Sequence, residues 1–385
     1  MFSTSVHVPC QTRSPLVRTS WGRIPAGHCR MRAAKFRGVR RSPQHGPQRL
    51  TPGQRPGSGM GSALRMIVPS TDTAPRCSVV IPTYNRAHSV GDAIASVLRQ
   101  TMADLECIVV DDGSTDSTPA LLASIKDQRL RAILGRHAGV AAARNLGVAH
   151  ARAPLVAFLD SDDLWRPHKL THEIAFLDRH PELDAVFSDL EKEDGGRVYP
   201  SFMRETAVFS GLLGEREYRD GVALSRREVF LVLLEEVPIK PSALTLRRDA
   251  FDKAGRFDET WSSSEDWEFL LRFARAHRFG YLDLPLAVLR VGDDSLHRTD
   301  QARGDTAMIR LLLRERRLLN GDREARAAVQ RGLVTRVKHF GWHHGDAGRR
   351  RAAAAVFLRG FVLTLSPGLL VRAFAVLLGL TRVAP

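Results

Sequence analysis

The stretch Phe158-Leu159-Asp160-Ser161-Asp162-Asp163 decides the fold, because an apolar run, Leu155 to Leu159, ends there in three carboxylates within four residues. A short apolar run with such an abrupt polar end is typical of a buried parallel strand. Polar groups at the carboxyl end of such a strand point into the crevice where open α/β sheets bind ligands. Like charges repel, so either the turn is solvated or a divalent cation relieves the crowding. Oxygen ligands suit Mg²⁺ or Mn²⁺, which complete their shells with water and substrate phosphates.

The residues upstream alternate between apolar runs and helical patterns. Strands are predicted at Cys77–Ile81, Glu106–Val110, Leu130–Leu134 and Leu155–Leu159, and helices from Ser89 onward, at Thr118–Lys126 and at Gly139–Ala151. Ser89 and Asp92 have the spacing of a capping box. Strands that alternate with helices in this rhythm predict right-handed βαβ units, and therefore an α/β fold with a mostly parallel sheet between flanking helices.

Three of these strands end in polar clusters at one predicted edge of the sheet. The clusters are Thr83 with Tyr84, Asp111 with Asp112, and Asp160 with Asp162. Because parallel strands open onto one crevice, a ligand site is favoured over three unrelated acidic turns. An aromatic ring and a carboxylate hold a nucleobase by stacking and by accepting its N–H. Arg144 would pair with a phosphate or, equally well from the sequence alone, with a surface carboxylate.

The basic residues of the chain are concentrated at its start. Residues 1–71 hold 12 Lys and Arg and no Asp or Glu, whereas the remainder of the 385 residues holds 45 basic and 42 acidic residues. This composition predicts a disordered basic tail over residues 1–75. A transit peptide, a nucleic-acid arm, and a start of translation at Met60 or Met66 stay open, and we favour the last. No aromatic or helical pattern in the tail favours nucleic acid as a partner.

Four segments in this order resemble family 2 glycosyltransferases, which have the GT-A fold. They are VVIPTYNR at 79–86, VDDGSTD at 110–116, GVAAARNLG at 139–147 and FLDSDD at 158–163. The resemblance covers about residues 76–300. It implies a nucleotide-diphosphate sugar as donor, Mn²⁺ or Mg²⁺ as cofactor, and inversion at the anomeric carbon. The glycine-rich NAD fingerprint does not occur in the sequence, which argues against a dehydrogenase.

The resemblance also assigns donor-binding residues. Pro82 and Tyr84 would flank the nucleobase, and Asp112 would accept its imide N–H. Arg144 falls beside the donor in the family's Ala-Arg-Asn segment, and Asp160 would lie near the ribose and the metal. His137 stands where many relatives have Asn, which is a mild departure.

Metal binding is implied for Asp160, Asp162 and His297. In many relatives a His follows the pair seen here as Leu289-Arg290, but this chain has Gly292 there and His297 five residues later. Either His297 or water would complete the shell, or the metal is held weakly, so the third ligand stays open.

The second half of the chain is expected to supply the acceptor site and the base. A strand is predicted at Asp184–Ser188, and residues 195–240 are predicted to be an irregular acceptor loop. A helix is predicted to start at Ser263 or Ser264. Acidic residues in a first helical turn usually only complement the helix dipole. The resemblance makes Asp266 the general base, which takes the acceptor hydroxyl's proton as its oxygen attacks the anomeric carbon.

The end of the chain is predicted to be helical. Ile309–Leu319 and Ala325–Phe340 read as amphipathic, Arg-rich helices, and Arg349-Arg350-Arg351 leads into the very apolar residues 352–380. Pro367 and Arg372 disfavour a membrane span, so two short helices broken at 366–368 are predicted. They either pack on the body of the protein or make peripheral membrane contact through 352–380 beside the basic cluster.

Together these features predict a basic tail at 1–75, a GT-A domain at 76–300 and a helical region at 301–385. The expected reaction is metal-dependent transfer of a sugar, first guess from a UDP-sugar, to a glycan or lipid-linked glycan. The four cysteines lack disulfide or metal spacing, which favours the cytoplasm, either free or at the inner face of the membrane. Two alternatives stay open: an inactive donor-binding partner of a membrane glycan-assembly complex, and a sugar nucleotidyltransferase, which normally carries a Gly-rich, basic loop after the first strand.

Overall fold

The computed structural model describes residues 65–67, 74–292 and 301–380, which fall within one compact unit, 61–385. The described strands are β1 (Arg65–Ile67), β2 (Cys77–Thr83), β3 (Leu105–Asp111), β4 (Leu130–Leu134), β5 (Leu155–Phe158), β6 (Leu164–Trp165), β7 (Ala185–Asp194), β8 (Arg197–Tyr199), β9 (Val222–Leu224), β10 (Leu244–Arg247) and β11 (Phe279–Val291). The helices before residue 280 are α1 (Val90–Leu98), α2 (Thr118–Ser124), α3 (Val140–Ala149), α4 (Lys169–Arg179), α5 (Phe202–Glu205), α6 (Ala207–Leu213), α7 (Arg226–Leu233), the 3₁₀ turn η1 (Pro241–Ala243), α8 (Arg248–Ala254) and α9 (Glu265–Ala276). The helices after it are α11 (Gln301–Leu318), α12 (Arg323–Asp346), α13 (Arg350–Thr364) and α14 (Pro367–Leu377).

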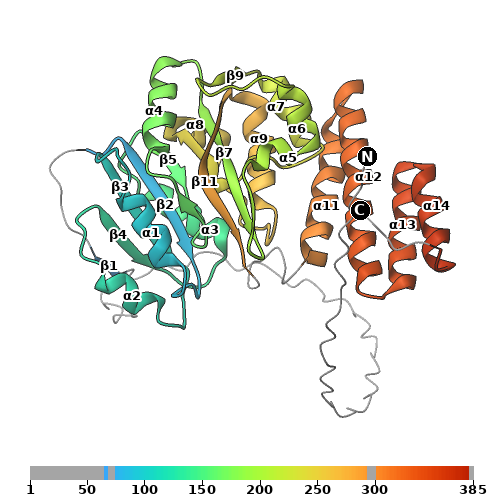
Figure 1. Cartoon of the computed structure of the whole chain (residues 1–385), viewed down its shortest axis with the longest axis horizontal. Helices are drawn as coiled ribbons and strands as arrows, with labels where there is room; N and C mark the ends of the chain where they lie inside the picture. Colours follow the sequence, from blue (N-terminus) through green and yellow to red (C-terminus); the bar gives the residue numbers. More distant parts are fainter. Residues whose placement is uncertain (1–64, 68–73, 293–300, 381–385) are drawn as a thin grey trace, which may run out of the picture. The chain divides into compact units, whose positions relative to one another are not determined.

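The described strands form one sheet in the order β1-β4-β3-β2-β5-β10-β7-β11-β6, with β8 added to β7 and β9 to β11 (Figure 1). Strands β4, β3, β2 and β5 pair in parallel, as predicted, and β7 pairs in parallel with β11. Strand β10 lies between β5 and β7 and pairs antiparallel with both. The six strands β4, β3, β2, β5, β7 and β11 therefore all run in one direction, and β10 runs opposite to them. The carboxyl ends of the six strands therefore open at the same edge of the sheet.

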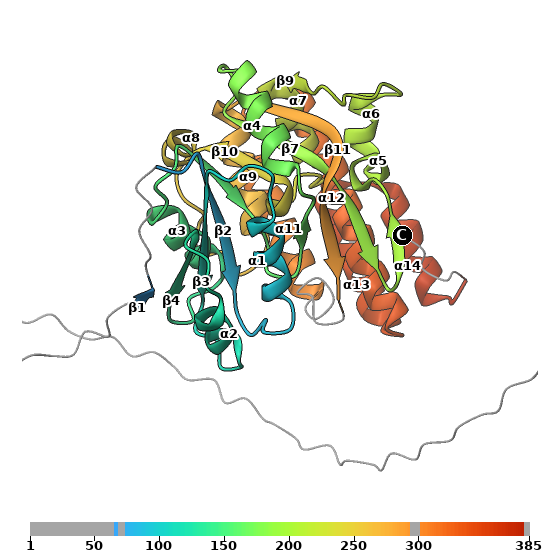
Figure 2. The same cartoon turned by 60° about the vertical axis from the view of Figure 1, so that its left-hand side comes forward.

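Alternate residues of the strands enter two hydrophobic cores, one on each face. Val79, Ile81 and Val109 pack with α1 and α4, whereas Val80 and Ile108 pack with α3, α7 and α9. Helices α1 and α3 accordingly cover opposite faces of β2 (Figure 2). Such a sheet, buried on both sides, requires strands that are apolar throughout, which is the pattern seen in β2 and β3.

Gly147 brings α3 close to the sheet. A Cβ at this position would lie 2.3 Å from Cγ1 of Val80, so only a glycine permits this approach. The close packing fixes the first turns of α3, and with them Arg144, relative to the ends of β2 and β5.

Three sequence predictions are corrected by the structure. Ser89 precedes α1, but its side chain makes no capping hydrogen bond, and its hydroxyl is buried without a partner. Residues 65–67, inside the predicted tail, form the edge strand β1, because backbone pairing with β4 holds even a three-residue segment. Residues 195–240 are not irregular: they hold β8, α5, α6, β9 and α7.

The C-terminal helices share the core of the sheet domain. Leu311 and Leu312 of α11 and Val329 and Leu333 of α12 belong to the same buried cluster as α7 and α9. Helices α13 and α14 form a smaller cluster on α12 around Phe357, and they break at 365–366, as predicted. None of the described helices combines the length and the apolar character that a membrane crossing requires.

Candidate active site

The loops that follow β2 and β3 are joined by hydrogen bonds around Asn85. Its Oδ1 accepts from the backbone N of Thr115 at 2.8 Å, and its own backbone N donates to Oγ of Ser114 at 2.8 Å. Asn85 has φ 53°, a left-handed conformation that Asn tolerates better than most residues. The two strand ends are thus held side by side, which places Tyr84 above the edge of the sheet.

Tyr84 and Asp112 meet at His137. The rings of Tyr84 and His137 are stacked, with centroids 4.1 Å apart, and Tyr84 is 41% exposed. Nδ1 of His137 lies 3.2 Å from Oδ2 of Asp112, whose carboxylate also accepts from the backbone N of Ala138 and Gly139, each at 2.8 Å. Asp112 therefore anchors the loop before α3. A base bound here would stack on an open aromatic face, whereas Pro82 is buried within β2.

The three carboxylates after β5 have different surroundings. Asp163 is buried; it accepts from the Ser242 hydroxyl at 2.5 Å and from the backbone N of Arg290 at 3.0 Å. Burial raises its pKa well above the usual value, and the charges of Asp160 and Asp162 raise it further. Asp160 and Asp162 keep about a third of their side chains exposed, at 31% and 30%. Asp163 thus fixes the turn, and the other two face the crevice.

Both exposed carboxylates face arginines. Asp162 Oδ2 lies 3.7 Å from Nη2 of Arg86. Asp160 Oδ1 accepts from Nη2 of Arg144 at 2.8 Å, and Nη1 of the same guanidinium donates to Oε1 of Glu265 at 2.6 Å. Arg144 is only 4% exposed, so its side chain is a buried link between β5 and α9. From the sequence, Arg144 had two possible partners, a phosphate or a surface carboxylate; in the structure it pairs with two carboxylates, and it is buried rather than at the surface.

Helix α9 presents Asp266 to the site. Glu265 and Trp267 are buried on either side of it, and Asp266 itself is partly exposed. The indole Nε1 of Trp267 donates to the Leu233 carbonyl at 2.6 Å and so fixes the rotation of the helix. Burial raises the pKa of Glu265. The charge of Arg144 lowers this pKa, and the charge of Asp266 raises it. Burial lowers the pKa of Arg144, but the charges of Asp160, Glu265 and Asp266 outweigh burial and raise it.

Several buried polar atoms around these residues lack hydrogen-bond partners. They are Thr83 Oγ1 at the end of β2, Nε of Arg144, and Oγ of Ser264 before α9. Ser264 also has φ 63°, which is costly for a serine and is typical of functional sites. Unsatisfied buried groups are rare in folded proteins, and a bound water, an ion, a ligand or local strain can account for them.

The carboxylates of Asp160 and Asp162 could provide some, but not all, of the ligands of a hard divalent ion. Within the described ranges no group of three or more His, Cys, Asp or Glu could hold a metal. The carboxylates of Asp160 and Asp162 would offer two hard oxygen ligands, a number that suits Mg²⁺ or Mn²⁺ when water and substrate phosphates complete the shell. His297, the third predicted ligand, lies outside the described residues.

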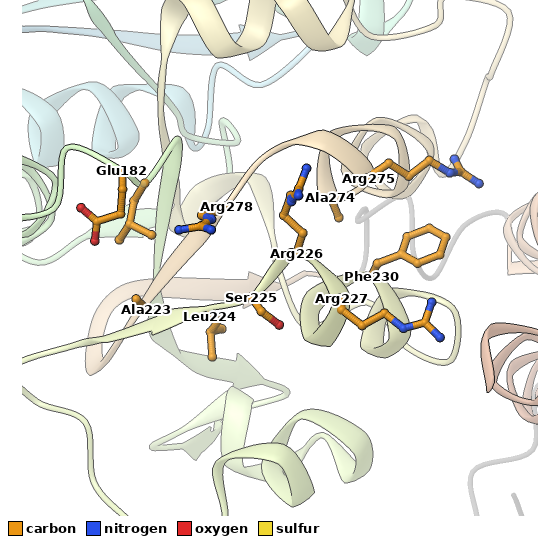
Figure 3. A pocket seen from close by; sticks show the side chains of 11 residues that line it. Glu182, Ala223, Leu224, Ser225, Arg226, Arg227, Phe230, Ala274, Arg275 and Arg278 are labelled. Atoms are coloured by element: carbon orange, nitrogen blue, oxygen red, sulfur yellow. The ribbon is translucent and has the colours of Figure 1, made fainter. Parts of the chain in front are cut away.

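A separate cavity of about 660 Å³ lies at the opposite edge of the sheet (Figure 3). It is bordered by Leu183, two residues before β7, by Arg278, directly before β11, and by arginines of α7 and α9. Two of these are engaged elsewhere, Arg227 with Asp322 and Arg275 with Glu315. Because the predicted site residues end strands rather than begin them, this cavity is not the candidate active site.

The mostly parallel sheet between two layers of helices, with an aromatic ring and aspartates at its carboxyl edge, has the architecture of the GT-A fold. The fold is similar to that of S. aureus TarS 1-349 in complex with UDP-GlcNAc, with a TM-score of 0.54 and 21% identity over 78% of this chain and 88% of that one. It is also similar to the mannosyltransferase PcManGT of Pyrobaculum calidifontis in complex with GDP-Man and Mn²⁺, with a TM-score of 0.52 and 19% identity over 81% and 82% of the two chains.

Residues 78–253 match the model of glycosyl transferase family 2, so this segment of the chain is a family 2 glycosyltransferase domain. The segment is similar to UDP-Glc:alpha-D-GlcNAc-diphosphoundecaprenol beta-1,3-glucosyltransferase WfgD of Escherichia coli, with 39% identity over 101 residues, 26% of this chain and 40% of that protein. The first curated relatives are matched over about a third of their own length.

Sequence reasoning missed three residues that shape this site. No role was assigned to Glu265, Arg86 or Ser242 from the sequence. Glu265 shares Arg144 with Asp160, Arg86 faces Asp162, and Ser242 both donates to Asp163 and accepts from the backbone N of Asp160 at 3.1 Å. Their partners are far away in the sequence, so no local pattern signals these roles.

Proposed function

We propose that this protein is an inverting glycosyltransferase that moves a sugar from a UDP-sugar to a glycan or lipid-linked glycan acceptor. The observation that carries the proposal is the group formed by Asp160, Arg144, Glu265 and Asp266, which joins the donor edge of the sheet to the start of α9. The UDP-GlcNAc complex of TarS and the UDP-Glc-dependent relative support a uridine nucleotide.

The donor would bind across the ends of β2, β3 and β5. The base stacks on Tyr84, beside Asp112 and the exposed ring of His137. Asp160 and Asp162 would hold Mn²⁺ or Mg²⁺, which the Mn²⁺ complex of PcManGT supports, and such an ion would offset the negative charge of a departing diphosphate. Arg144 keeps Asp160 oriented from within the protein.

Asp266 would act as the general base. It is the partly exposed carboxylate of the first turn of α9, and its Oδ1 accepts from the backbone N of Trp267 at 2.8 Å, which restrains its rotamer. In this position it takes the proton of the acceptor hydroxyl while that oxygen attacks the anomeric carbon. Attack and departure occur in one displacement, so no covalent enzyme intermediate is formed and the configuration inverts.

A thermal-shift screen of UDP-, GDP- and dTDP-sugars with and without Mn²⁺ tests the donor assignment, because a ligand that binds only the folded state raises its melting temperature. A UDP-sugar should give the largest Mn²⁺-dependent shift. Slow hydrolysis of that donor without acceptor would separate an active enzyme from an inactive donor-binding partner. Absence of any shift, or release of pyrophosphate from UTP and a sugar phosphate, would contradict a transferase.

The C-terminal hairpin provides a surface for peripheral membrane contact. Exposed apolar side chains recur at helical spacing on α13 and α14: Leu358, Val362, Leu365, Val371, Phe374 and Leu378. The exposed arginines 349–351 and 359 lie in the same segment, and this charge favours an anionic lipid surface. This proposal locates the enzyme at the cytoplasmic face of the membrane.

Flotation with phosphatidylglycerol vesicles tests this contact. It should be lost in the double variant Val362→Asp/Phe374→Asp and retained in Arg323→Asp, a control on α12. Equal flotation of the two variants would contradict the proposal.

A further inference from the structure

The residues 255–264 lead from α8 into α9 without forming a helix or a strand. The segment matters for the site because Asp266 lies in the helical turn that follows it. Since no backbone ladder orders these residues, side chains from other elements must fix their path. Arg272 of α9 holds the beginning of the segment by donating to the carbonyl oxygens of Gly255 and Arg256, at 3.2 and 2.7 Å.

The middle of this segment is bound to α3 by Asn145. Its Nδ2 donates to the carbonyl oxygen of Phe257 at 2.9 Å, and its Oδ1 accepts from the backbone N of the same residue at 3.0 Å. Nδ2 also donates to Oε1 of Glu259 at 2.9 Å. Asn145 is only 4% exposed, so these hydrogen bonds are shielded from water. The amide thus pairs with both backbone groups of Phe257, as a neighbouring strand would.

The ring of Phe257 lies between the two elements that carry the candidate site carboxylates. It meets Phe158 of β5 edge to face, with ring centroids 5.5 Å apart, and its centroid lies 4.5 Å from that of Phe269 of α9. Phe158 is two residues before Asp160, and Phe269 is three residues after Asp266. Because the three rings are buried and in contact, a shift of Phe257 would change the separation of β5 and α9.

Helix α3 can set this separation because it is itself fixed to the donor edge of the sheet. The carboxylate of Asp112 accepts from the backbone N of Gly139, the residue before α3, at 2.8 Å. Gly147 lets the same helix approach Val80 of β2 closely. Asn145 projects from the part of α3 between these two anchors, so it fixes the segment before α9 relative to the donor edge.

We propose that Asn145 is a positioning residue for the general base. By holding Phe257 it keeps β5 and α9 at the separation at which Asp266 reaches the acceptor hydroxyl beside a donor bound at Asp160. Asn145 is buried, so it acts on the reaction through Phe257 and not by contact with a substrate. This inference rests on the proposed function, because the effect assigned to Asn145 operates only through Asp266.

A double-mutant cycle of Asn145→Ala and Asp266→Asn tests this role, with kcat at saturating UDP-sugar and acceptor as the readout. Asn145→Ala alone should lower kcat by roughly 10- to 100-fold, the loss expected when a reacting group is misplaced by about 1 Å. In the Asp266→Asn background the same change should lower kcat by less than about twofold, because no base is left to misplace. A loss in the double variant equal to the product of the two single losses would overturn the inference.

Gln100→Ala is the matched control, because Gln100 is also a buried amide that binds the backbone of a distant segment. Its Nε2 donates to the carbonyl oxygen of Arg166 at 2.8 Å, and its Oε1 accepts from the backbone N of Leu170 at 3.1 Å. Both alanine variants should lower the melting temperature, because each leaves buried backbone groups unpaired. Only Asn145→Ala should lower kcat. An equal loss of kcat in Gln100→Ala would mean that lost stability explains the effect, and would contradict the inference.

Asn145→Asp provides a second test in case the alanine variant does not fold. It keeps the acceptor for the backbone N of Phe257 but loses both donated hydrogen bonds, so kcat should fall in the same range. Mn²⁺-dependent UDP affinity should stay within about twofold of wild type in each Asn145 variant; a collapse would assign Asn145 to the donor site and overturn the inference. Unchanged kcat in Asp266→Asn would refute the proposed function, whereas a fall there with wild-type kcat in the Asn145 variants would refute the inference alone.

Discussion

The carboxylates of Asp160 and Glu265 are held together by one guanidinium, that of Arg144. Asp160 ends β5 and Glu265 begins α9, and both accept hydrogen bonds of 2.8 Å or less from Arg144. Asp266 follows Glu265 directly, so the position of the candidate base depends on the same ion pairs that orient a candidate metal ligand. The two halves of the site are thereby coupled through a buried side chain.

Arg144→Met should destabilise the protein by about 3–5 kcal/mol, because it leaves Glu265 buried without a counter-charge. Arg144→Lys keeps the positive charge but loses the bidentate geometry of the guanidinium, so its stability should lie between that of the wild type and that of Arg144→Met. Urea unfolding measures both. If Arg144 instead served mainly as a phosphate contact, one of the two roles left open by the sequence, stability would be nearly unchanged and donor affinity alone would fall.

Asp162→Ala should abolish the Mn²⁺ dependence of UDP binding, because it removes one of two exposed carboxylate ligands from the turn after β5. Calorimetric titration of UDP with and without Mn²⁺ measures this effect. Asp178→Ala, at an exposed aspartate of α4 that pairs with Arg76, is the matched control. Metal-dependent UDP affinity that survives in Asp162→Ala would remove Asp162 from the metal site.

The half of the sheet formed by residues 77–158 could be predicted well from the sequence. Strands β2, β3, β4 and β5 are short apolar runs with polar ends, and this pattern is local. The polar residues at the ends of these strands also identified the edge of the sheet that carries Tyr84, Asp112, Asp160 and Asp162. Such predictions succeed because each strand is buried on both faces, so its whole length must be apolar.

The rest of the fold and of the candidate site could not be predicted from the sequence, because it depends on contacts between segments that are distant along the chain. Residues 195–240 form short helices and strands whose ends are fixed by tertiary partners such as Glu236, which accepts from the first turn of α6. The buried state of Asp163 and the link from Arg144 to Glu265 likewise require the folded arrangement of β5, η1 and α9. Neither composition nor periodicity carries that information.

Gly332→Ala should lower stability by roughly 1–3 kcal/mol through overpacking, although alanine favours helices. A Cβ at Gly332 would lie 2.2 Å from the carbonyl oxygen of Leu234, so α12 could no longer approach the end of α7. Gly211→Ala in α6 is the matched control: no atom lies within 4 Å of its added Cβ, and the change should be neutral or stabilising. Thermal unfolding of both variants measures the difference. Equal melting temperatures would show that α12 does not pack in this way.

Glu106 should make stability sensitive to acid. It is buried, and burial opposes its ionisation, but hydrogen bonds from Ser78, the backbone of Arg152 and Arg131 outweigh this and lower its pKa below the ordinary value of 4.5. The folded state therefore binds this proton more weakly than the unfolded state, so the stabilisation is present above about pH 4.5 and is lost as pH falls through the lowered pKa.

Glu106→Gln should therefore destabilise the protein at pH 7 by about 3–5 kcal/mol, the cost of breaking a buried ion pair. The difference from the wild type should narrow below pH 4.5, as measured by urea midpoints at several pH values. A difference that stays constant down to the acid limit of folding would mean that Glu106 is not ionised in the native protein.

The central claim is that Asp266 is the base of a glycosyl transfer, and kcat in Asp266→Asn, measured beside donor affinity, tests it most directly. The asparagine keeps the shape and the hydrogen bond from the backbone of Trp267 but cannot take a proton. The account predicts that kcat falls by roughly 10²- to 10⁴-fold, while Mn²⁺-dependent affinity for the UDP-sugar stays within about twofold of wild type. Unchanged kcat, or a collapse of donor affinity with kcat preserved at saturation, would contradict it.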